Sequence, residues 1–131
     1  MTTELRSTVS DEHRERVKEI FARADACDPD GLSPYLAPDA TLTVGNEPPL
    51  RGIDEVRAGS ERFFSMIAGL RHEILGLWTS DRATTIKLRV TYTRLDGGVV
   101  TIPVVTLMET EDGSDLIKEY SVYFDPAPVF A

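Results

Sequence analysis

The sequence contains few of the residues that enzymes most often use for chemistry. Its 131 residues include a single cysteine, Cys27, with two histidines, one asparagine and no glutamine. A single cysteine excludes an internal disulfide and favours a reducing compartment. The sequence also lacks an apolar run close to the roughly 20 residues that span a membrane. Its N-terminus is too polar for a secretory signal, so we expect a cytoplasmic protein.

Basic residues are the second shortage. The chain has 14 Lys and Arg against 22 Asp and Glu, which gives a formal net charge of −8 at pH 7. Nucleic acids and anionic membrane surfaces attract proteins through basic patches, so we expect neither as a partner. The length fits one domain, and the hydrophobic content of 41% is ordinary for a globular protein. We therefore expect a single domain over residues 1–131, with residues 1–9 as a flexible arm and 126–131 as a C-terminal tail.

The first part of the chain carries helical patterns. Ser10 is a predicted N-cap, and the apolar side chains that follow it repeat at helical spacing, which predicts a helix over residues 10–26. Asp28 followed by Pro29 predicts the start of a short helix that ends near residues 36–37. The acidic residues of this segment lack the full pattern of a calcium loop, so we predict no metal site there.

A second long helix is predicted to begin at a cap formed by Asp54 and to run to about Ala68. Its predicted buried stripe consists of Val56, Phe63, Phe64, Ile67 and Leu70. Gly59 lies inside this helix and weakens it by about 1 kcal/mol relative to alanine. We interpret this glycine as a sign of close packing against another element.

The remaining segments alternate apolar and polar residues, as strands do. The predicted strands are 40–44, 72–78, 83–94, 99–110 and 116–124. Asp96 followed by Gly97 predicts a hairpin between two of them, and Pro103 predicts an edge position or a bulge. Helices followed by a run of strands indicate an α+β fold. We expect a cone in which a curved antiparallel sheet wraps over the N-terminal helices and encloses an apolar pocket.

Several segments resemble nuclear transport factor two-like domains. They are LAPDATL at residues 36–42, NEP at 46–48, RG at 51–52 and VR at 56–57. The closing segment IKEYSVYFD, at 117–125, resembles the last strand of the SnoaL-like branch. The resemblance covers about residues 10–128 and implies the cone fold. It also implies relatives such as polyketide cyclases, ketosteroid isomerases and limonene epoxide hydrolases, which act without a cofactor.

The resemblance also allows the catalytic residues of these relatives to be sought in this chain. The positions that match the ketosteroid isomerase set are Val44, Ile20 and Val105, none of which can transfer a proton. No arrangement places the two carboxylates of the epoxide hydrolases on the matching strands. Asp125 aligns with the acid/base aspartate of the SnoaL-like cyclases. Two interpretations of Asp125 remain open, because an aspartate before proline also closes strands by bonding nearby backbone groups.

His72 is the second candidate catalytic residue. It begins a predicted strand, where it could carry protons at the mouth of the cavity near neutral pH. A histidine at this position could equally bond a neighbouring backbone carbonyl, and the sequence leaves both interpretations open.

The predicted pocket wall consists of aromatic and apolar strand and helix residues. The candidate ligand contacts are Trp78, Tyr92, Tyr120, Tyr123, Phe124, Phe64 and Val44. Successive strand residues face opposite sides of a sheet, so Tyr120 and Phe124 share one face of the last strand, and Tyr123 and Asp125 share the other. By analogy with the hydrolases, the first pair faces inward.

Two hypotheses about function follow. The first is an enzyme that transfers protons on a small, mostly apolar organic molecule, with Asp125 or His72 as acid/base and a tyrosine that orients the substrate. The second is a domain that binds a small ligand, or dimerises, without catalysis. The resemblance implies a homodimer that pairs through the outer face of the sheet.

Overall fold

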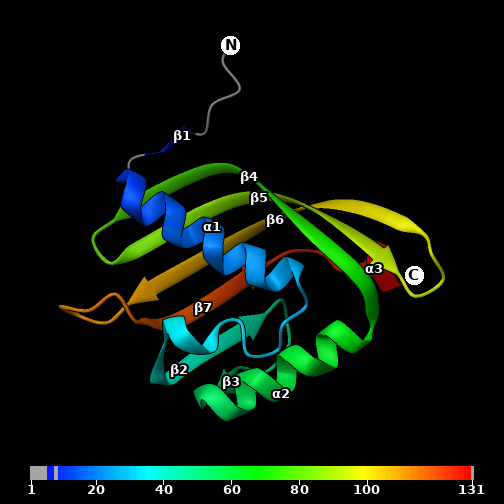
Figure 1. The fold of residues 1–131 in the computed structure, drawn as a ribbon, viewed down its shortest axis with the longest axis horizontal. Coiled ribbons are helices and arrows are strands. Elements are labelled where there is room, and N and C mark those ends of the chain that lie inside the picture. The colour runs from blue at the N-terminus through cyan, green and yellow to red at the C-terminus, as the bar shows by residue number, and fades with distance from the viewer. Residues whose placement is uncertain (1–5, 8, 131) are drawn as a thin grey trace.

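The computed structural model describes residues 6–7 and 9–130, so most of the predicted N-terminal arm and the last residue of the predicted tail lie outside the described residues. Figure 1 shows the elements of the fold. In chain order they are β1 (Arg6–Ser7), α1 (Asp11–Asp25), the 3-10 helix η1 (Ser33–Tyr35), β2 (Leu36–Val44), β3 (Leu50–Arg51), α2 (Gly52–Ser65), β4 (Ile67–Ser80), β5 (Ala83–Arg94), β6 (Val99–Thr110), β7 (Ile117–Tyr123) and α3 (Ala127–Phe130). None of the helices in the described ranges combines the length and the apolar character that crossing a membrane requires.

The seven strands of the described residues form one sheet, in the order β1-β4-β5-β6-β7-β2-β3. Strands β4 to β7 follow one another as an antiparallel meander, whereas β2 pairs parallel to β7 and β1 pairs parallel to β4. The sheet curves, with α1 lying across one of its faces and α2 beside β2 and β3 (Figure 1). The predicted α+β fold, a curved sheet wrapped over helices, is confirmed.

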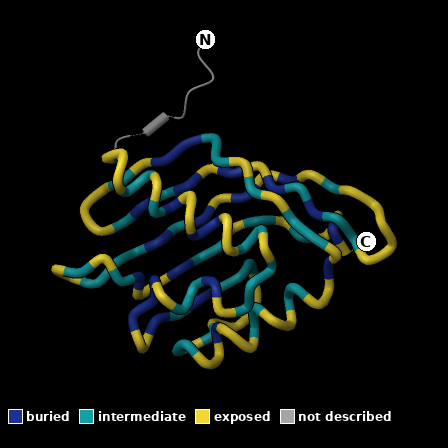
Figure 2. The backbone as a smooth tube through the Cα atoms, viewed as in Figure 1, coloured by how far each residue is buried: buried dark blue, intermediate teal, exposed yellow. Residues whose placement is uncertain are grey.

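Alternating side chains of the sheet form the core. On β5 the inward residues Ile86, Leu88, Val90 and Tyr92 are all buried, as their spacing predicts. On α1 the apolar stripe of Val17, Ile20 and Phe21 is buried against them. Figure 2 shows the buried residues following the strands, while the exposed ones gather on the turns and on the outer sides of the helices.

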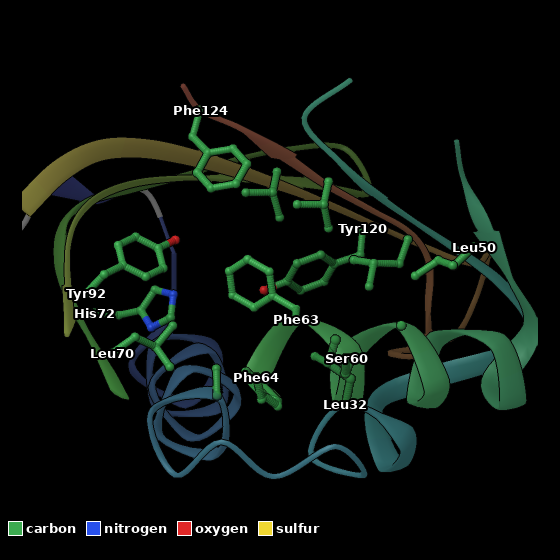
Figure 3. Close-up of a pocket in the computed structure, with 15 residues that line it drawn as sticks. Leu32, Leu50, Ser60, Phe63, Phe64, Leu70, His72, Tyr92, Tyr120 and Phe124 are labelled. Carbon is green, nitrogen blue, oxygen red and sulfur yellow. The ribbon is translucent and has the colours of Figure 1, made fainter. Parts of the chain in front are cut away.

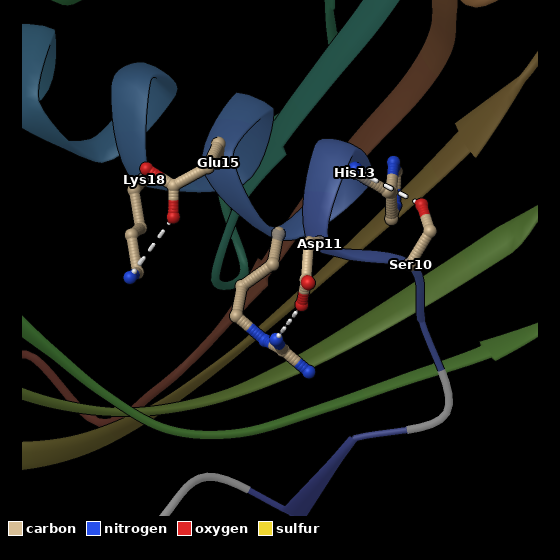
Figure 4. Close-up of polar contacts among 6 residues, drawn as sticks. Ser10, Asp11, His13, Glu15 and Lys18 are labelled. Carbon is tan, nitrogen blue, oxygen red and sulfur yellow. Dashed lines mark hydrogen bonds and ion pairs between the residues drawn. The ribbon is translucent and has the colours of Figure 1, made fainter.

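The polar contacts at the N-terminus and on the exposed side of α1 follow from its sequence. The Ser10 hydroxyl accepts a hydrogen bond from the backbone N–H of His13 at 3.2 Å, which confirms Ser10 as the N-cap (Figure 4). On the exposed side, Asp11 pairs with Arg14 and Glu15 pairs with Lys18. The ring of His13 turns toward the sheet instead, and its Nε2 atom lies 2.9 Å from the hydroxyl of Thr84. His13 therefore has a hydrogen-bond partner in the sheet.

The predicted boundaries before β2 are wrong. Instead of a capped helix that reaches residues 36–37, the chain forms turns and then η1, and residue 36 already begins β2. The predicted strand over 40–44 therefore begins four residues earlier than expected. The pairing of β2 with β7 is irregular between Leu36 and Thr41. Pro38 lies in this irregular part, where a residue without an N–H group is tolerated.

The predicted bounds of the second long helix are also wrong. Arg51, not Asp54, is the N-cap residue of α2, and its backbone N–H donates to the Glu55 carboxylate at 2.9 Å. The helix ends at Ser65 because the chain turns directly into β4. Ile67 and Leu70 therefore belong to a strand, and the helical stripe is reduced to Val56, Phe63 and Phe64.

The long strands are predicted well. Strands β5 and β6 have the predicted bounds, and Gly97 adopts the positive φ of +89° that the hairpin between them requires. Pro103 was predicted to lie at an edge or a bulge, but β6 is an inner strand of the sheet. Its pairing with β7 begins at Val105, so Pro103 lies in the half of β6 that β7 does not reach. The missing N–H group of the proline therefore costs no bond to β7.

Candidate active site

A small apolar cavity lies between α2 and the inner face of the sheet (Figure 3). Its volume is about 120 Å³. The polar or amphipathic side chains in its wall are Ser60, His72, Tyr92 and Tyr120, and the rest of the wall is apolar. An apolar wall with a few polar groups is typical of a site for a small organic molecule.

The structure brings six of the nine predicted site residues to this cavity. They are Val44, Phe64, His72, Tyr92, Tyr120 and Phe124. The predicted inward face of the last strand is therefore correct. The other three predicted residues, Trp78, Tyr123 and Asp125, do not line the cavity, and each has a physical reason for its place.

Asp125 lies outside the cavity, exposed, just after β7. Its Oδ1 atom accepts a hydrogen bond from the backbone N–H of Ala127 at 3.0 Å, a turn that precedes α3. Of the two interpretations, the geometry fits the local structural one. Tyr123 shares the outward face of β7 and is 58% exposed. Alternation along the strand accounts for both positions.

Trp78 is displaced by a bulge in β4. Simple alternation from His72 would place Trp78 on the inner face, but the pairing of β4 with β5 shifts by one residue between Ile74 and Gly76. A shift of one residue exchanges the two faces of a strand. Leu77 is therefore the fully buried residue, and the Trp78 ring lies outside against Gly76.

The cavity histidine is held by a carboxylate that sequence reasoning missed. The Asp25 Oδ1 atom, at the end of α1, lies 2.6 Å from His72 Nδ1 and also accepts the backbone N–H of His72 at 3.0 Å. The His72 ring is mostly buried and packs against the Phe21 ring, with centroids 4.7 Å apart and the planes tilted by 34°. A carboxylate in the last turn of a helix opposes the helix dipole, which was the available signal that Asp25 has another partner.

This contact fixes the role of each ring nitrogen. A carboxylate accepts hydrogen bonds and does not donate them when ionised, so Nδ1 carries the proton in the neutral ring. The Nε2 atom then has a free lone pair, and it forms no hydrogen bond with the residues that the structure describes. His72 is thus held in one orientation at the wall of the cavity.

Tyr92 lies near His72. Leu70 and His72 on β4 pair with Tyr92 and Val90 on β5, and the Tyr92 hydroxyl and the His72 ring lie at the same end of the cavity (Figure 3). Burial raises the pKa of Tyr92 to about 12. Burial also raises the pKa of Tyr120, while its hydrogen bond with Thr106 acts in the opposite direction. Both phenols are therefore neutral hydrogen-bond donors at physiological pH.

The fold and the site together define a class: an α+β cone with an apolar cavity and a few polar groups at one end. The family model described as the SnoaL-like domain matches residues 17–120. The chain belongs to the SnoaL-like domain family. No curated protein sequence matches it.

Solved structures share the whole fold. A nuclear transport factor 2-like protein of unknown function from Burkholderia pseudomallei has a TM-score of 0.81 and 21% identity, and the match covers 93% of this chain and 100% of that one. A putative SnoaL-like polyketide cyclase from Jannaschia has a TM-score of 0.78 and 19% identity, and the match covers 97% of this chain and 94% of that one. A hypothetical protein with a ketosteroid isomerase-like fold from Catenulispora acidiphila, in complex with trimethylamine, has a TM-score of 0.79 and 19% identity, and the match covers 88% of each chain. Identities this low show the fold alone.

The raised pKa of Tyr92 predicts a pH dependence of stability. In the unfolded chain this phenol loses its proton near pH 10, and in the folded protein near pH 12. Between these values the unfolded state binds fewer protons, so the free energy of unfolding falls as pH rises, by up to about 1.4 kcal/mol per pH unit. Denaturant titrations of Tyr92→Phe should show a flatter fall over this range than the wild type.

The matched control for this experiment is Tyr123→Phe, at an exposed position. It should leave the slope of the wild type unchanged. Equal slopes for Tyr92→Phe and the wild type would contradict the buried, proton-retaining state of Tyr92.

Proposed function

We propose that the protein transfers protons on a small, mostly apolar organic molecule, with His72 Nε2 as the base and acid. The observation that carries the proposal is the 2.6 Å contact between Asp25 and His72 Nδ1. It leaves Nε2 for the cavity and supplies a negative charge beside the ring when the ring is protonated. The complex of the Catenulispora relative with trimethylamine supports a small organic ligand.

The residues suit the removal of a proton from carbon next to a carbonyl group. The C–H bond breaks, the proton moves to Nε2, and the electron pair forms an enolate whose charge develops on oxygen. Asp25 stabilises the resulting imidazolium, and the neutral Tyr92 hydroxyl donates a hydrogen bond to the enolate oxygen. Return of the proton to another carbon completes an isomerisation. Its delivery to the alkoxide of an intramolecular aldol step completes a cyclisation.

This chemistry needs no cofactor, and it assigns no role to Asp125. The mostly apolar wall contributes to it, because charges that develop in a water-poor cavity interact strongly with nearby donors. The alternative, a binding module without catalysis, uses the same cavity but requires nothing of His72.

Hydrogen exchange of small ketones tests the proposal. A panel that includes indanone and tetralone is incubated with the protein in heavy water, and loss of the α-hydrogen signals is followed by proton NMR. The wild type should accelerate exchange, and His72→Gln should slow the catalysed rate by about 10²–10⁴-fold. Asp125→Asn should leave the rate unchanged.

The same experiment separates the alternatives. Equal exchange rates for His72→Gln and the wild type would contradict the role of His72. If the ketones bind to the wild type without any accelerated exchange, the binding module is the correct account.

We also propose that two copies pair through the outer face of the sheet. Val105 on β6 and Tyr123 on β7 lie opposite each other in the ladder and are 38% and 58% exposed. Val99, on the same face of β6, is 65% exposed. Exposed apolar side chains that gather on one face favour association.

Sedimentation velocity over a range of concentrations tests the pairing. The wild type should sediment as a dimer, and Tyr123→Lys should shift it towards the monomer because an unpaired charge would be buried at the contact. Leu95→Lys is the matched control, since Leu95 is 69% exposed but lies in the hairpin between β5 and β6. A wild type that remains monomeric throughout would overturn the pairing.

A further inference from the structure

A second cavity adjoins the first. It has a volume of about 320 Å³, and its wall includes five residues that also line the inner cavity: Leu42, Val44, Leu50, Gly59 and Phe63. Pockets for small organic molecules typically measure about 300–1,000 Å³. The inner cavity alone is below this range, and the two together fall within it. A ligand of ordinary size beside His72 would therefore extend into the outer cavity.

The junction between the cavities depends on Gly59. A Cβ atom at this position would clash with the Leu50 side chain at Cδ1. The close packing predicted from this glycine is therefore confirmed: β3 approaches α2 where the helix has no side chain. The Leu50 side chain lies in the wall of both cavities, so it stands at the boundary between them.

The outer cavity differs from the inner one in charge. Its wall contains two ionic side chains, Arg62 on α2 and Glu47 in the turn after β2. Over residues 6–7 and 9–130, Arg62 forms no ion pair, whereas Arg57 on the same helix pairs with Asp30 and Glu61. A guanidinium group binds a carboxylate through two parallel hydrogen bonds, so Arg62 has the chemistry to recognise one.

We infer that the ligand is an elongated amphiphile whose apolar or aromatic body occupies the inner cavity and whose carboxylate binds Arg62 in the outer cavity. The inference rests on the proposed function, which places the reacting part of the ligand beside His72. The aromatic side chains Phe63, Phe64 and Tyr92 of the inner wall suit an aryl group. Glu47 opposes an anion in the same cavity, so its charge lowers the affinity that Arg62 provides.

Two series of probes test this inference: ω-phenylalkanoates of increasing chain length and the ω-phenylalkanols of the same lengths. Isothermal titration calorimetry measures each Kd. For the wild type, the carboxylates should bind more tightly than the alcohols by about tenfold once the chain reaches Arg62, in line with a charge-assisted hydrogen bond. Short carboxylates should show no such preference.

Matched variants assign the preference to one side chain. Arg62→Met keeps the apolar stem, so it should abolish the preference for carboxylates and leave the affinity for alcohols unchanged. Glu47→Gln should strengthen the binding of carboxylates by about threefold. Arg57→Met, on the same helix but outside the cavity, should change neither series. Gly59→Ala displaces Leu50, which lines both cavities, and should weaken the long probes more than the short ones.

The inference is overturned if the wild type binds carboxylates and alcohols equally at every chain length, if neither series binds, or if Arg62→Met weakens both series alike. These results are distinct from a failure of the proposed function. Exchange of α-hydrogens in small ketones depends on His72 and does not require Arg62. A normal exchange rate without a carboxylate preference therefore refutes the role of Arg62 alone.

Discussion

The site depends on one contact, between the Asp25 carboxylate and His72. A single oxygen accepts hydrogen bonds from both the ring and the backbone of His72, at 2.6 and 3.0 Å. These bonds join the end of α1 to β4, so the same interaction ties the helix to the sheet and orients the His72 ring at the cavity wall. An isolated histidine in an apolar wall would have two interchangeable tautomers. The carboxylate removes that freedom, because it favours the tautomer with the proton on Nδ1 and the lone pair on Nε2.

The rest of the cavity supports this contact through its shape. The curved sheet places Tyr92 and Tyr120 at the inner wall, where burial raises the pKa of each phenol and keeps it a donor. The glycine at position 59 allows the Leu50 side chain of β3 to pack against α2, beside a larger outer cavity whose wall contains Arg62 and Glu47. Polar side chains therefore lie in two adjoining cavities, His72 and the tyrosines in the inner one and Arg62 and Glu47 in the outer one.

Much of the fold could be predicted from the sequence because its strands alternate regularly. The inward residues of β5 and the inward face of β7 follow from a period of two, and the hairpin at Gly97 follows from its Asp-Gly turn. Trp78 was placed on the wrong face, because the bulge between Ile74 and Gly76 reverses the faces of β4. Gly76 was the available signal, since an isolated glycine inside a strand suggests a bulge. Helix ends were misplaced where the chain enters a strand directly, as at Ser65.

Only part of the candidate site could be predicted from the sequence. His72 and the tyrosines belong to strands with clear alternation, whereas Asp25 meets His72 across 47 positions of chain, and no local pattern links them. Asp125 aligns with the acid/base aspartate of the SnoaL-like cyclases, yet its carboxylate stabilises the turn before α3. The role of a residue is thus inferred less safely from its type at an aligned position than from the contacts of its side chain in the folded protein.

The most direct test of this account is nitrogen NMR of the imidazole of His72 in protein labelled with ¹⁵N-histidine, with His13→Gln to assign the signals. In the neutral ring, the proton should reside on Nδ1 and the lone pair on Nε2, and Asp25→Asn should weaken this preference. A proton on Nε2, or a tautomer ratio that Asp25→Asn leaves unchanged, would contradict an oriented base. The cavity would then be better described as a binding site without proton transfer.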